Sequence, residues 1–340
     1  MVQKQRQPAH GQFFKATLLG AAAGLAALAP AALAQEESEE AASIQETIIV
    51  IAPDYVAQDG ATANKSNIPL IQTPQSVSVI TRDQIDLLAF IDAQQAVRYT
   101  AGTFGENYGP DLRFDFVTVR GFTPKQYIDG LAAPVSTSIQ SVGLDLYAFE
   151  SFDVLKGPAS ALYGSSPPGG LYNQISRRPT GEFGGEVQAK LGTDEYKQIA
   201  GTVHGPLSDT VSYSLTGLYL DRGAERDDVS AERLMVAPAL TWEITPSTKL
   251  TGLGYYQSDE VRGDTNGFLP VYGTLLPNPL GQIDPSTNLG DPNNLFDRDQ
   301  WGAGYEFSHA FSDAVTFISN LKVSKYDEDT PTGIYGGGGL

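Results

Sequence analysis

The chain has 340 residues and a formal net charge of −18, with 40 acidic residues against 22 basic ones. It contains no cysteine, which excludes disulfides, thiolate chemistry and cysteine-based metal sites. Such an acidic chain is unsuited to nucleic acids, because binding to phosphates needs clustered Lys and Arg. The length is sufficient for two domains.

The first 34 residues have the three parts of a secretory signal peptide. Basic residues Lys4, Arg6 and Lys15 accompany an Ala- and Leu-rich run over 16–29, and Ala32-Leu33-Ala34 forms a small-residue cleavage site. A buried Ala-rich helix is the alternative, but it would need neither the basic flank nor the cleavage site. We therefore expect residues 1–34 to be removed and the mature chain to begin at Gln35.

A β-branched run follows an acidic spacer near the start of the mature chain. The run consists of Glu46, Thr47, Ile48, Ile49, Val50 and Ile51. It could form a short buried strand, or a free strand that pairs with the sheet edge of a partner protein through main-chain hydrogen bonds. Pro, Gly, Asn and Asp punctuate residues 52–67, which we interpret as a linker.

Short strands and helices interleave over residues 68–180, which predicts one compact domain. Ser76–Ile80 alternates as a strand, and Thr81 with Gln84 forms a capping box for a helix through about Phe90. A second short helix is expected near Asp92–Tyr99. Further short strands are expected at Phe116–Arg120, Gln126–Ile128 and Phe152–Leu155.

Glycine and proline crowd the stretch Phe149–Thr180, between two apolar strands. Glycine permits positive φ and proline fixes φ, so such residues mark tight turns. The stretch is not a nucleophile elbow, because Pro168 stands where G-x-S-x-G requires its second glycine. It is not a phosphate loop either, because no Gly-Lys-Ser/Thr follows. The apolar anchors around the turn indicate a compact, folded backbone.

After Pro179, apolar and polar residues alternate with a period of two. This pattern predicts about seven antiparallel strands. They are expected near 183–192, 196–204, 210–221, 231–244, 247–258, 299–311 and 314–325. Short turns alternate with longer loops, the longest over Ser258–Arg298. A soluble sandwich shows the same alternation, but this asymmetry of the connections favours an outer-membrane barrel.

A sheet of this size does not close into a barrel, because lipid cannot satisfy the backbone groups at its two free edges. The final residues 335–340, rich in glycine, do not read as another strand. We therefore expect the chain to be a fragment of a longer protein or a truncated product.

The stretch 149–180 resembles the end of the plug domain in TonB-dependent outer-membrane siderophore receptors. The matching residues are Lys156-Gly157-Pro158, Leu162-Tyr163-Gly164, Ser166-Pro167-Pro168-Gly169-Gly170, Asn173 and Ser176-Arg177-Arg178-Pro179. Upstream, Val119-Arg120-Gly121-Phe122 and Tyr127-Ile128-Asp129-Gly130 match two further signatures in the same order. The departures are one inserted proline and a lysine for arginine at position 156. The resemblance covers residues 46–325.

The resemblance implies an α+β fold, in which a globular plug precedes the first strands of an incomplete antiparallel transmembrane β-barrel. Residues 46–51 would be the TonB box, within an N-terminal periplasmic segment over 35–67. Residues 68–180 would form the plug, and residues 181–340 the partial barrel.

The family's ligand-contacting positions are also implied by the resemblance. They correspond here to Phe104, to Thr123, Pro124, Lys125 and Gln126, to the loop 133–137, and to Phe268. Departures at several of these positions leave the particular siderophore open, although Phe268-Leu269-Pro270 resembles the hydroxamate branch that includes the ferrichrome receptors. Arg120 and Lys156 would either face glutamates on barrel strands beyond residue 340 or be solvated on the plug.

The implied function is import of a ferric siderophore across the outer membrane of a Gram-negative bacterium, driven through TonB. Iron would arrive within the ligand, with no cofactor or resident metal, and no catalytic constellation suggests an enzyme. The expected partners are TonB, the ferric siderophore and outer-membrane lipid, but not nucleic acid. The alternatives are import of cobalamin, a sugar or another metal chelate, a passive channel, and a truncated receptor without transport. A passive channel would need neither a plug nor the run 46–51.

Overall fold

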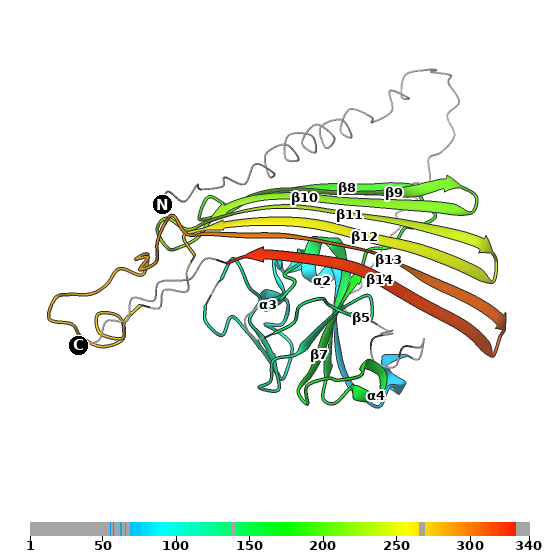
Figure 1. Ribbon diagram of the computed structural model, residues 1–340, viewed down its shortest axis with the longest axis horizontal. Helices are drawn as coiled ribbons and strands as arrows, with labels where there is room; N and C mark the ends of the chain where they lie inside the picture. Colours follow the sequence, from blue (N-terminus) through cyan, green and yellow to red (C-terminus); the bar gives the residue numbers. More distant parts are fainter. Residues whose placement is uncertain are drawn as a thin grey trace, which may run out of the picture. The chain divides into compact units, whose positions relative to one another are not determined.

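The computed structural model describes residues 55, 57, 62, 65, 69–109, 111–137, 141–264 and 269–330. The expected signal peptide, the run 46–51 and Phe268 lie outside the described residues. A region of short strands and helices over 69–180, here termed the plug, precedes a seven-stranded sheet over 184–329, here termed the wall (Figure 1). No helix within the described ranges is long and apolar enough to cross a membrane.

The plug is built on a five-stranded sheet with the order β1-β6-β7-β4-β5. Its strands are β1 (Ser76–Thr81), β4 (Lys125–Ile128), β5 (Leu131–Ala132), β6 (Phe149–Lys156) and β7 (Gly170–Ser176). The β4–β7 pair is parallel and the other pairs are antiparallel. A separate ribbon joins β2 (Thr103–Gly105) to β3 (Val117–Val119). The strands predicted for the plug are confirmed, whereas the short strands β2 and β5 are not among those predicted.

The plug helices are single turns or little more. They are η1 (Leu70–Gln72), α2 (Arg82–Leu87), α3 (Ala93–Ala96), η2 (Leu146–Ala148) and α4 (Ser160–Tyr163). Thr81 caps α2 by accepting a hydrogen bond from the Gln84 N–H, as the capping box predicts. The expected extension of α2 to Phe90 is wrong, because Ala89 takes a positive φ of 52° that ends the helix. The second helix likewise begins after its cap Asp92 but ends at Ala96.

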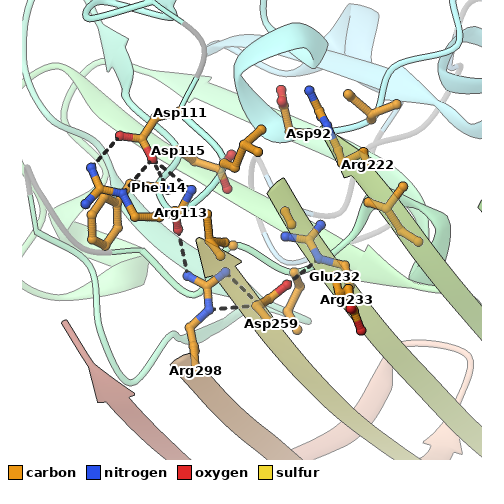
Figure 2. Close-up of a pocket in the computed structure, with 17 residues that line it drawn as sticks. Asp92, Asp111, Arg113, Phe114, Asp115, Arg222, Glu232, Arg233, Asp259 and Arg298 are labelled. Atoms are coloured by element: carbon orange, nitrogen blue, oxygen red, sulfur yellow. Dashed lines mark hydrogen bonds and ion pairs between the residues drawn. The ribbon is translucent and has the colours of Figure 1, made fainter. Parts of the chain in front are cut away.

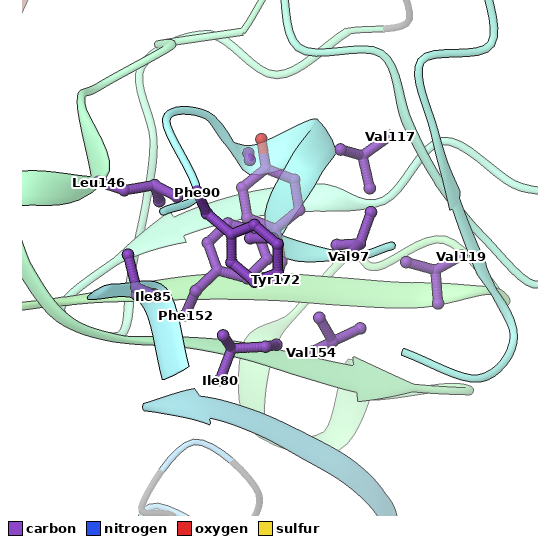
Figure 3. Packing of buried hydrophobic residues seen from close by; sticks show 12 residues of the cluster. Ile80, Ile85, Phe90, Val97, Val117, Val119, Leu146, Phe152, Val154 and Tyr172 are labelled. Atoms are coloured by element: carbon purple, nitrogen blue, oxygen red, sulfur yellow. The ribbon is translucent and has the colours of Figure 1, made fainter. Parts of the chain in front are cut away.

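The main core of the plug lies between its sheet and these short helices (Figure 3). Phe152 on β6 and Tyr172 on β7 stack with ring centroids 5.0 Å apart. Buried aliphatic side chains from the helices, the ribbon and the neighbouring strands surround this aromatic pair: Ile80, Ile85, Val97, Val117, Val119, Leu146 and Val154. Segments far apart in sequence are therefore joined by one apolar cluster, in which burial of each aliphatic side chain contributes about 1.5–3 kcal/mol.

The Gly169-Gly170 turn brings β7 against its neighbours at a distance that no side chain permits. Gly170 has a φ of 134°, and a Cβ at this position would lie 2.0 Å from the Leu155 carbonyl oxygen. A Cβ at Gly169 would lie 2.2 Å from the Val119 carbonyl oxygen. Because both contacts are with backbone, neither can relax by a side-chain movement. The turn is compact and folded, as its sequence indicates.

Each wall strand pairs antiparallel with the next strand in the sequence. The strands are β8 (Gly184–Leu191), β9 (Lys197–Ser208), β10 (Val211–Gly223), β11 (Ser230–Thr245), β12 (Thr248–Arg262), β13 (Leu295–Ser312) and β14 (Val315–Asp329). In β12, every second residue from Thr251 to Val261 is buried and the residues between them are more exposed. The predicted number and order of strands are confirmed for the described residues.

The long loop of the wall is shorter than the sequence suggests. Strand β12 continues to Arg262 and β13 begins at Leu295, so the loop occupies 263–294 rather than Ser258–Arg298. Asp259 and Arg298 are thus strand residues, and both are buried. Their polarity made these segments resemble loop, because the expected strand pattern places charged side chains in water rather than against another domain.

We expect Gly170→Val to destabilise the protein by at least about 1–3 kcal/mol, the range for enforced backbone strain, with the overlap on Leu155 adding to it. Ser165→Val is the matched control, because Ser165 is an exposed residue of the same stretch. Thermal unfolding of the two variants in detergent measures the difference. Equal melting temperatures would show that the stretch tolerates side chains and is not a tight turn.

Candidate functional site

Plug and wall meet across an interface that combines apolar contacts with buried charged groups. Phe114 and Phe116 of the plug pack with Ala231, Val261 and Phe296 of the wall. A second cluster joins plug residues over 128–149 to wall residues on β9–β12. The polar contacts come from two irregular plug segments, 111–115 and 141–145, which face β11–β13.

Arg298 is the central polar contact of this interface (Figure 2). Its guanidinium donates two hydrogen bonds to Asp259 Oδ2, at 3.0 and 2.8 Å. Nη1 donates to the carbonyl oxygens of Arg113 at 3.0 Å and Ser141 at 3.3 Å. A Cβ at Gly143, which has a φ of 53°, would lie 2.9 Å from Nη2. Glycine at 143 therefore lets the guanidinium lie against the plug backbone.

Asp259 connects Arg298 to a second arginine and so to another plug residue. Arg233 Nε donates to Asp259 Oδ1 at 2.5 Å, and its Nη1 donates to Asp145 Oδ2 at 3.1 Å. Asp145 belongs to the plug, where its other oxygen accepts from the Tyr147 N–H and caps η2. Two wall arginines and one wall aspartate therefore hold both plug segments in one buried, alternating charge network.

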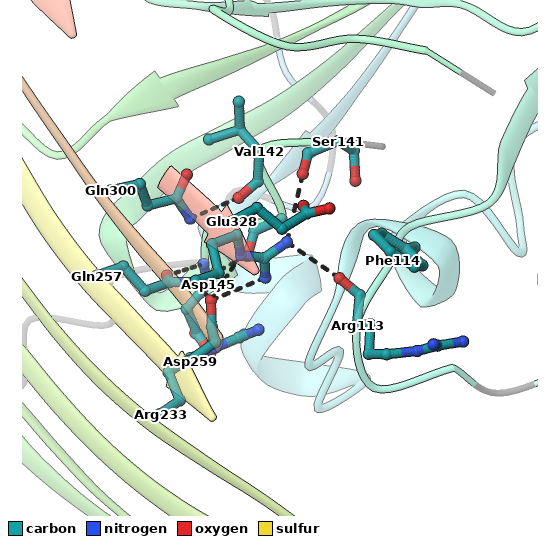
Figure 4. Close-up of polar contacts among 12 residues, drawn as sticks. Arg113, Phe114, Ser141, Val142, Asp145, Arg233, Gln257, Asp259, Gln300 and Glu328 are labelled. Atoms are coloured by element: carbon teal, nitrogen blue, oxygen red, sulfur yellow. Dashed lines mark hydrogen bonds and ion pairs between the residues drawn. The ribbon is translucent and has the colours of Figure 1, made fainter. Parts of the chain in front are cut away.

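Two wall glutamines form further hydrogen bonds with the segment 141–145 (Figure 4). Gln257 Nε2 donates to the Gly143 carbonyl at 2.9 Å, and its Oε1 accepts from the Asp145 N–H at 2.9 Å. Gln300 Nε2 donates to the Val142 carbonyl at 2.6 Å. Irregular backbone buried in the interface therefore receives its partners from wall side chains, as buried peptide groups require.

A second polar contact fixes the turn at Asp129. Its carboxylate accepts from Lys322 Nζ of β14 at 2.8 Å and from the Ser176 N–H of β7 at 2.8 Å. Arg178, at the exit of the plug, lies 3.5 Å from the same carboxylate and pairs with Glu306 of β13 at 2.6 Å. The basic exit of the plug is thus bound directly to the wall.

A small cavity of about 50 Å³ lies between plug and wall, at the ends of β10–β13 that adjoin their longer loops. Asp92 and Asp115 of the plug line it together with Arg222 of the wall, which lies beside Asp92 in Figure 2. The pKa of Asp115 is raised to about 7, chiefly by burial and next by the Asp92 carboxylate, although nearby Arg233 and Arg298 oppose the rise. Burial also raises the pKa of Asp92. Both carboxyl groups therefore ionise less readily than exposed aspartates do.

The structure separates the expected ligand-contacting residues by exposure. Phe104 on β2 is 63% exposed, Thr123 is exposed, and Lys125 is half-buried. Pro124 and Gln126 are buried, and the Gln126 amide is used inside the plug, donating to Gln174 and accepting from the Val142 N–H. Phe104, Thr123 and Lys125 thus retain exposed surface, as do Pro134 and Thr137 in the loop 133–137.

Arg120 and Lys156 lie beside each other on the plug. A Cβ at Gly102 would contact both side chains at 3.9 Å, and the Arg120 charge joins burial in lowering the pKa of Lys156. Lys156 Nζ donates to Ser78 Oγ and to the Ala101 carbonyl. No carboxylate among the described residues pairs with either cation, and Arg120 is exposed. Their expected glutamate partners remain a prediction.

Within the described ranges, no three His, Asp or Glu side chains gather in an arrangement able to hold a metal ion.

Comparison with known proteins shows the family. Residues 69–171 match the TonB-dependent Receptor Plug Domain. Over 98% of its length, the chain is 33% identical to the ferrichrome outer membrane transporter/phage receptor of Escherichia coli K12. The chain belongs to the TonB-dependent receptors.

This receptor chain spans only part of the relatives that it matches. It covers 46% of the ferrichrome transporter and 40% of the ferrioxamine B receptor of Salmonella typhimurium SL1344, to which it is 36% identical. Its fold is shared with the ferripyoverdine receptor of Pseudomonas aeruginosa, with a TM-score of 0.72 at 23% identity over 79% of this chain and 36% of that one. Like the ferrichrome transporter, it is an outer-membrane protein of a Gram-negative bacterium.

Sequence reasoning did not find the residues that bind plug to wall in this receptor chain. Arg233, Asp259 and Arg298 belong to no sequence motif, and their contacts join positions 26 to 185 residues apart. One signal was present. Gln257 and Asp259 continue the inward-facing positions of β12, so polar residues in phase with a buried face could have indicated a buried polar interface.

Arg298→Met should destabilise the protein by about 3–5 kcal/mol, because it removes one partner from a buried ion pair and leaves plug carbonyls without donors. Arg262→Met is the control, since Arg262 pairs with Glu260 but its side chain is 52% exposed, and exposed pairs contribute about 0–1 kcal/mol. Urea unfolding in detergent compares the two variants. Equal unfolding midpoints would refute a central role for Arg298.

The free energy of unfolding should fall as pH rises between the unfolded and folded pKa values of Asp115. Its folded pKa of about 7 exceeds its ordinary value of 3.8, so the folded protein retains a proton that the unfolded chain releases between these values. Asp115→Asn stays neutral and should raise the melting temperature at about pH 8 more than at about pH 4. Asp209→Asn, in an exposed wall turn, is the control. An equal effect of Asp115→Asn at both pH values would contradict the assignment.

Proposed function

We propose that the protein imports a ferric siderophore of the hydroxamate class across the outer membrane. The observation that carries this proposal is the identity of 33% and 36% to proteins named for ferrichrome and ferrioxamine B, which are both ferric hydroxamates. Receptors named for catecholate siderophores also match, but at 27% identity or less. Transport rather than catalysis is the activity that these relatives support.

The exposed plug aromatic Phe104 is suited to such a ligand. A ferric hydroxamate is a rounded complex with little net charge, so contact with aromatic and apolar surface favours its binding more than a fixed opposite charge does. Phe104 is 63% exposed, and Thr123 and Lys125 offer polar contacts. We propose these three residues, with Phe268 from the loop after β12, as the ligand surface. Iron would be carried within the ligand, with no cofactor of the protein.

Energy for import would come through the segment 46–51, acting as a TonB box. Its β-branched residues favour an extended strand, and strand addition to the partner's sheet would supply affinity through main-chain hydrogen bonds. The buried polar network holds the plug against the wall, and these are the contacts that a pulling partner would have to break. The partners proposed are therefore TonB, the ferric siderophore and the lipid around the wall.

Ile48→Pro should abolish uptake while leaving siderophore binding intact, because proline removes a main-chain donor from the pairing strand. Ala41→Pro, in the acidic spacer, is the matched control and should take up iron normally. The measurement is uptake of radioactive iron as ferrichrome, ferrioxamine B and a ferric catecholate by cells in which this is the sole siderophore receptor.

Normal uptake by the Ile48→Pro variant would contradict energy coupling through this segment and favour a passive channel. Uptake of the ferric catecholate alone would retain the transport function and refute the hydroxamate class.

A further inference from the structure

Thr62, in the linker between the segment 46–51 and the plug, is held by the plug itself. Its side chain and backbone are buried, with 2% of its surface exposed. The residue lies 11 positions after Ile51 and seven positions before Pro69, where the continuously described plug begins. A buried polar residue in a linker requires hydrogen-bond partners, and three plug residues supply them.

The three partners come from three different elements. Thr62 Oγ1 donates to Asp153 Oδ2 of β6 at 2.5 Å and accepts from Asn173 Nδ2 of β7 at 2.9 Å. Tyr163 of α4 donates its hydroxyl to the Thr62 carbonyl at 2.6 Å. Asp153, Tyr163 and Asn173 are defined here as the clasp.

The clasp residues are themselves fixed in place. Asn173 Oδ1 accepts from the Gly130 N–H at 3.0 Å, and Asp153 Oδ1 accepts from Ser151 Oγ at 2.7 Å. The Tyr163 ring packs edge-on against Tyr127, with ring centroids 4.8 Å apart. The linker adds one more contact, because Lys65 Nζ lies 4.4 Å from the centre of the Tyr163 ring.

Thr62 matters to the clasp because the Asp153 carboxylate has no cation to pair with among the described residues. Asp153 is 3% exposed, and its side-chain hydrogen bonds come from the hydroxyls of Thr62 and Ser151. Burial raises the pKa of Asp153, and these two hydrogen bonds act against that rise. If Thr62 left, Asp153 would keep only the hydrogen bond from Ser151, and the Tyr163 hydroxyl would lose its acceptor. The free-energy cost of these lost hydrogen bonds opposes release.

We propose that the clasp retains the linker on the plug and thereby limits how far the segment 46–51 reaches from it. Release would free residue 62 from the plug, whose continuously described part begins at residue 69. The additional seven residues span at most about 25 Å when fully extended, a substantial gain for a segment that must meet a partner's sheet. The proposal rests on the proposed function for its biological meaning, but the clasp is tested without transport.

The absence of cysteine from the chain allows one engineered thiol to report release. Ala57→Cys places this thiol at a half-buried position five residues before Thr62. The rate of maleimide labelling is measured in isolated outer membranes without siderophore. Thr62→Val, which keeps the shape but loses the hydroxyl, should label about fivefold faster, the change expected when one buried hydrogen bond is lost. Thr62→Ser, which keeps the hydroxyl, should restore the parent rate.

A matched pair of tyrosines separates release from general loosening of the plug. Tyr163→Phe removes the hydroxyl that donates to Thr62, whereas Tyr127→Phe removes one that donates to the Tyr163 carbonyl at 2.7 Å. Each variant loses one buried hydrogen bond in the same cluster. We expect faster labelling only for Tyr163→Phe.

The proposal is overturned if Thr62→Val and Tyr163→Phe both label at the parent rate, or if Tyr127→Phe labels as fast as Tyr163→Phe. Uptake assays on the same variants distinguish this failure from that of the proposed function. Faster labelling of Thr62→Val, in a protein that imports none of the siderophores tested, would support the clasp and refute import.

Discussion

Buried peptide groups must find hydrogen-bond partners, and this requirement explains the polar interface on which the arrangement of plug and wall depends. The plug segments 111–115 and 141–145 are irregular, so their carbonyl groups lack partners within a sheet or helix. The wall supplies these partners through Arg298, Gln257 and Gln300. An apolar inner face would exclude water from the same carbonyl groups without providing hydrogen-bond donors in its place. The inner face of β12 and β13 is therefore polar at Gln257, Arg298 and Gln300, where it meets these irregular segments.

A polar interface of this kind fixes the position of the plug on the wall without making the free-energy cost of separating them very large. The cost of desolvating Arg298 and Asp259 offsets much of their attraction, so an intact buried pair contributes little net free energy although the loss of one partner is expensive. Hydration of the separated charges is favourable, whereas hydration of separated apolar surfaces costs free energy. Charged contacts beside modest apolar clusters therefore keep the plug in register on the wall without making its separation prohibitively costly.

The sequence predicted regular structure well and long-range contacts poorly. Alternation with a period of two located all the described wall strands, because each strand has one buried and one exposed face. It misplaced the ends of β12 and β13, where Asp259 and Arg298 face a domain rather than water. Capping located the start of α2, but the positive φ of Ala89 had no signal in the sequence. Gln126 matched a ligand-contacting position by resemblance, and only its neighbours in space reveal that its amide serves the plug interior.

The two kinds of contact also differ in the length of chain that they close. Strand pairing within the wall joins segments adjacent in sequence, so most pairs form across short turns. Contacts between plug and wall, by contrast, close loops of 112 to 194 residues at Gln257, Arg298 and Lys322. Closing a long loop costs more entropy than closing a short turn. We therefore expect such contacts to form after local strand pairing during folding. We therefore expect docking of the plug, rather than growth of the sheet, to be the slower step when this part of the molecule assembles.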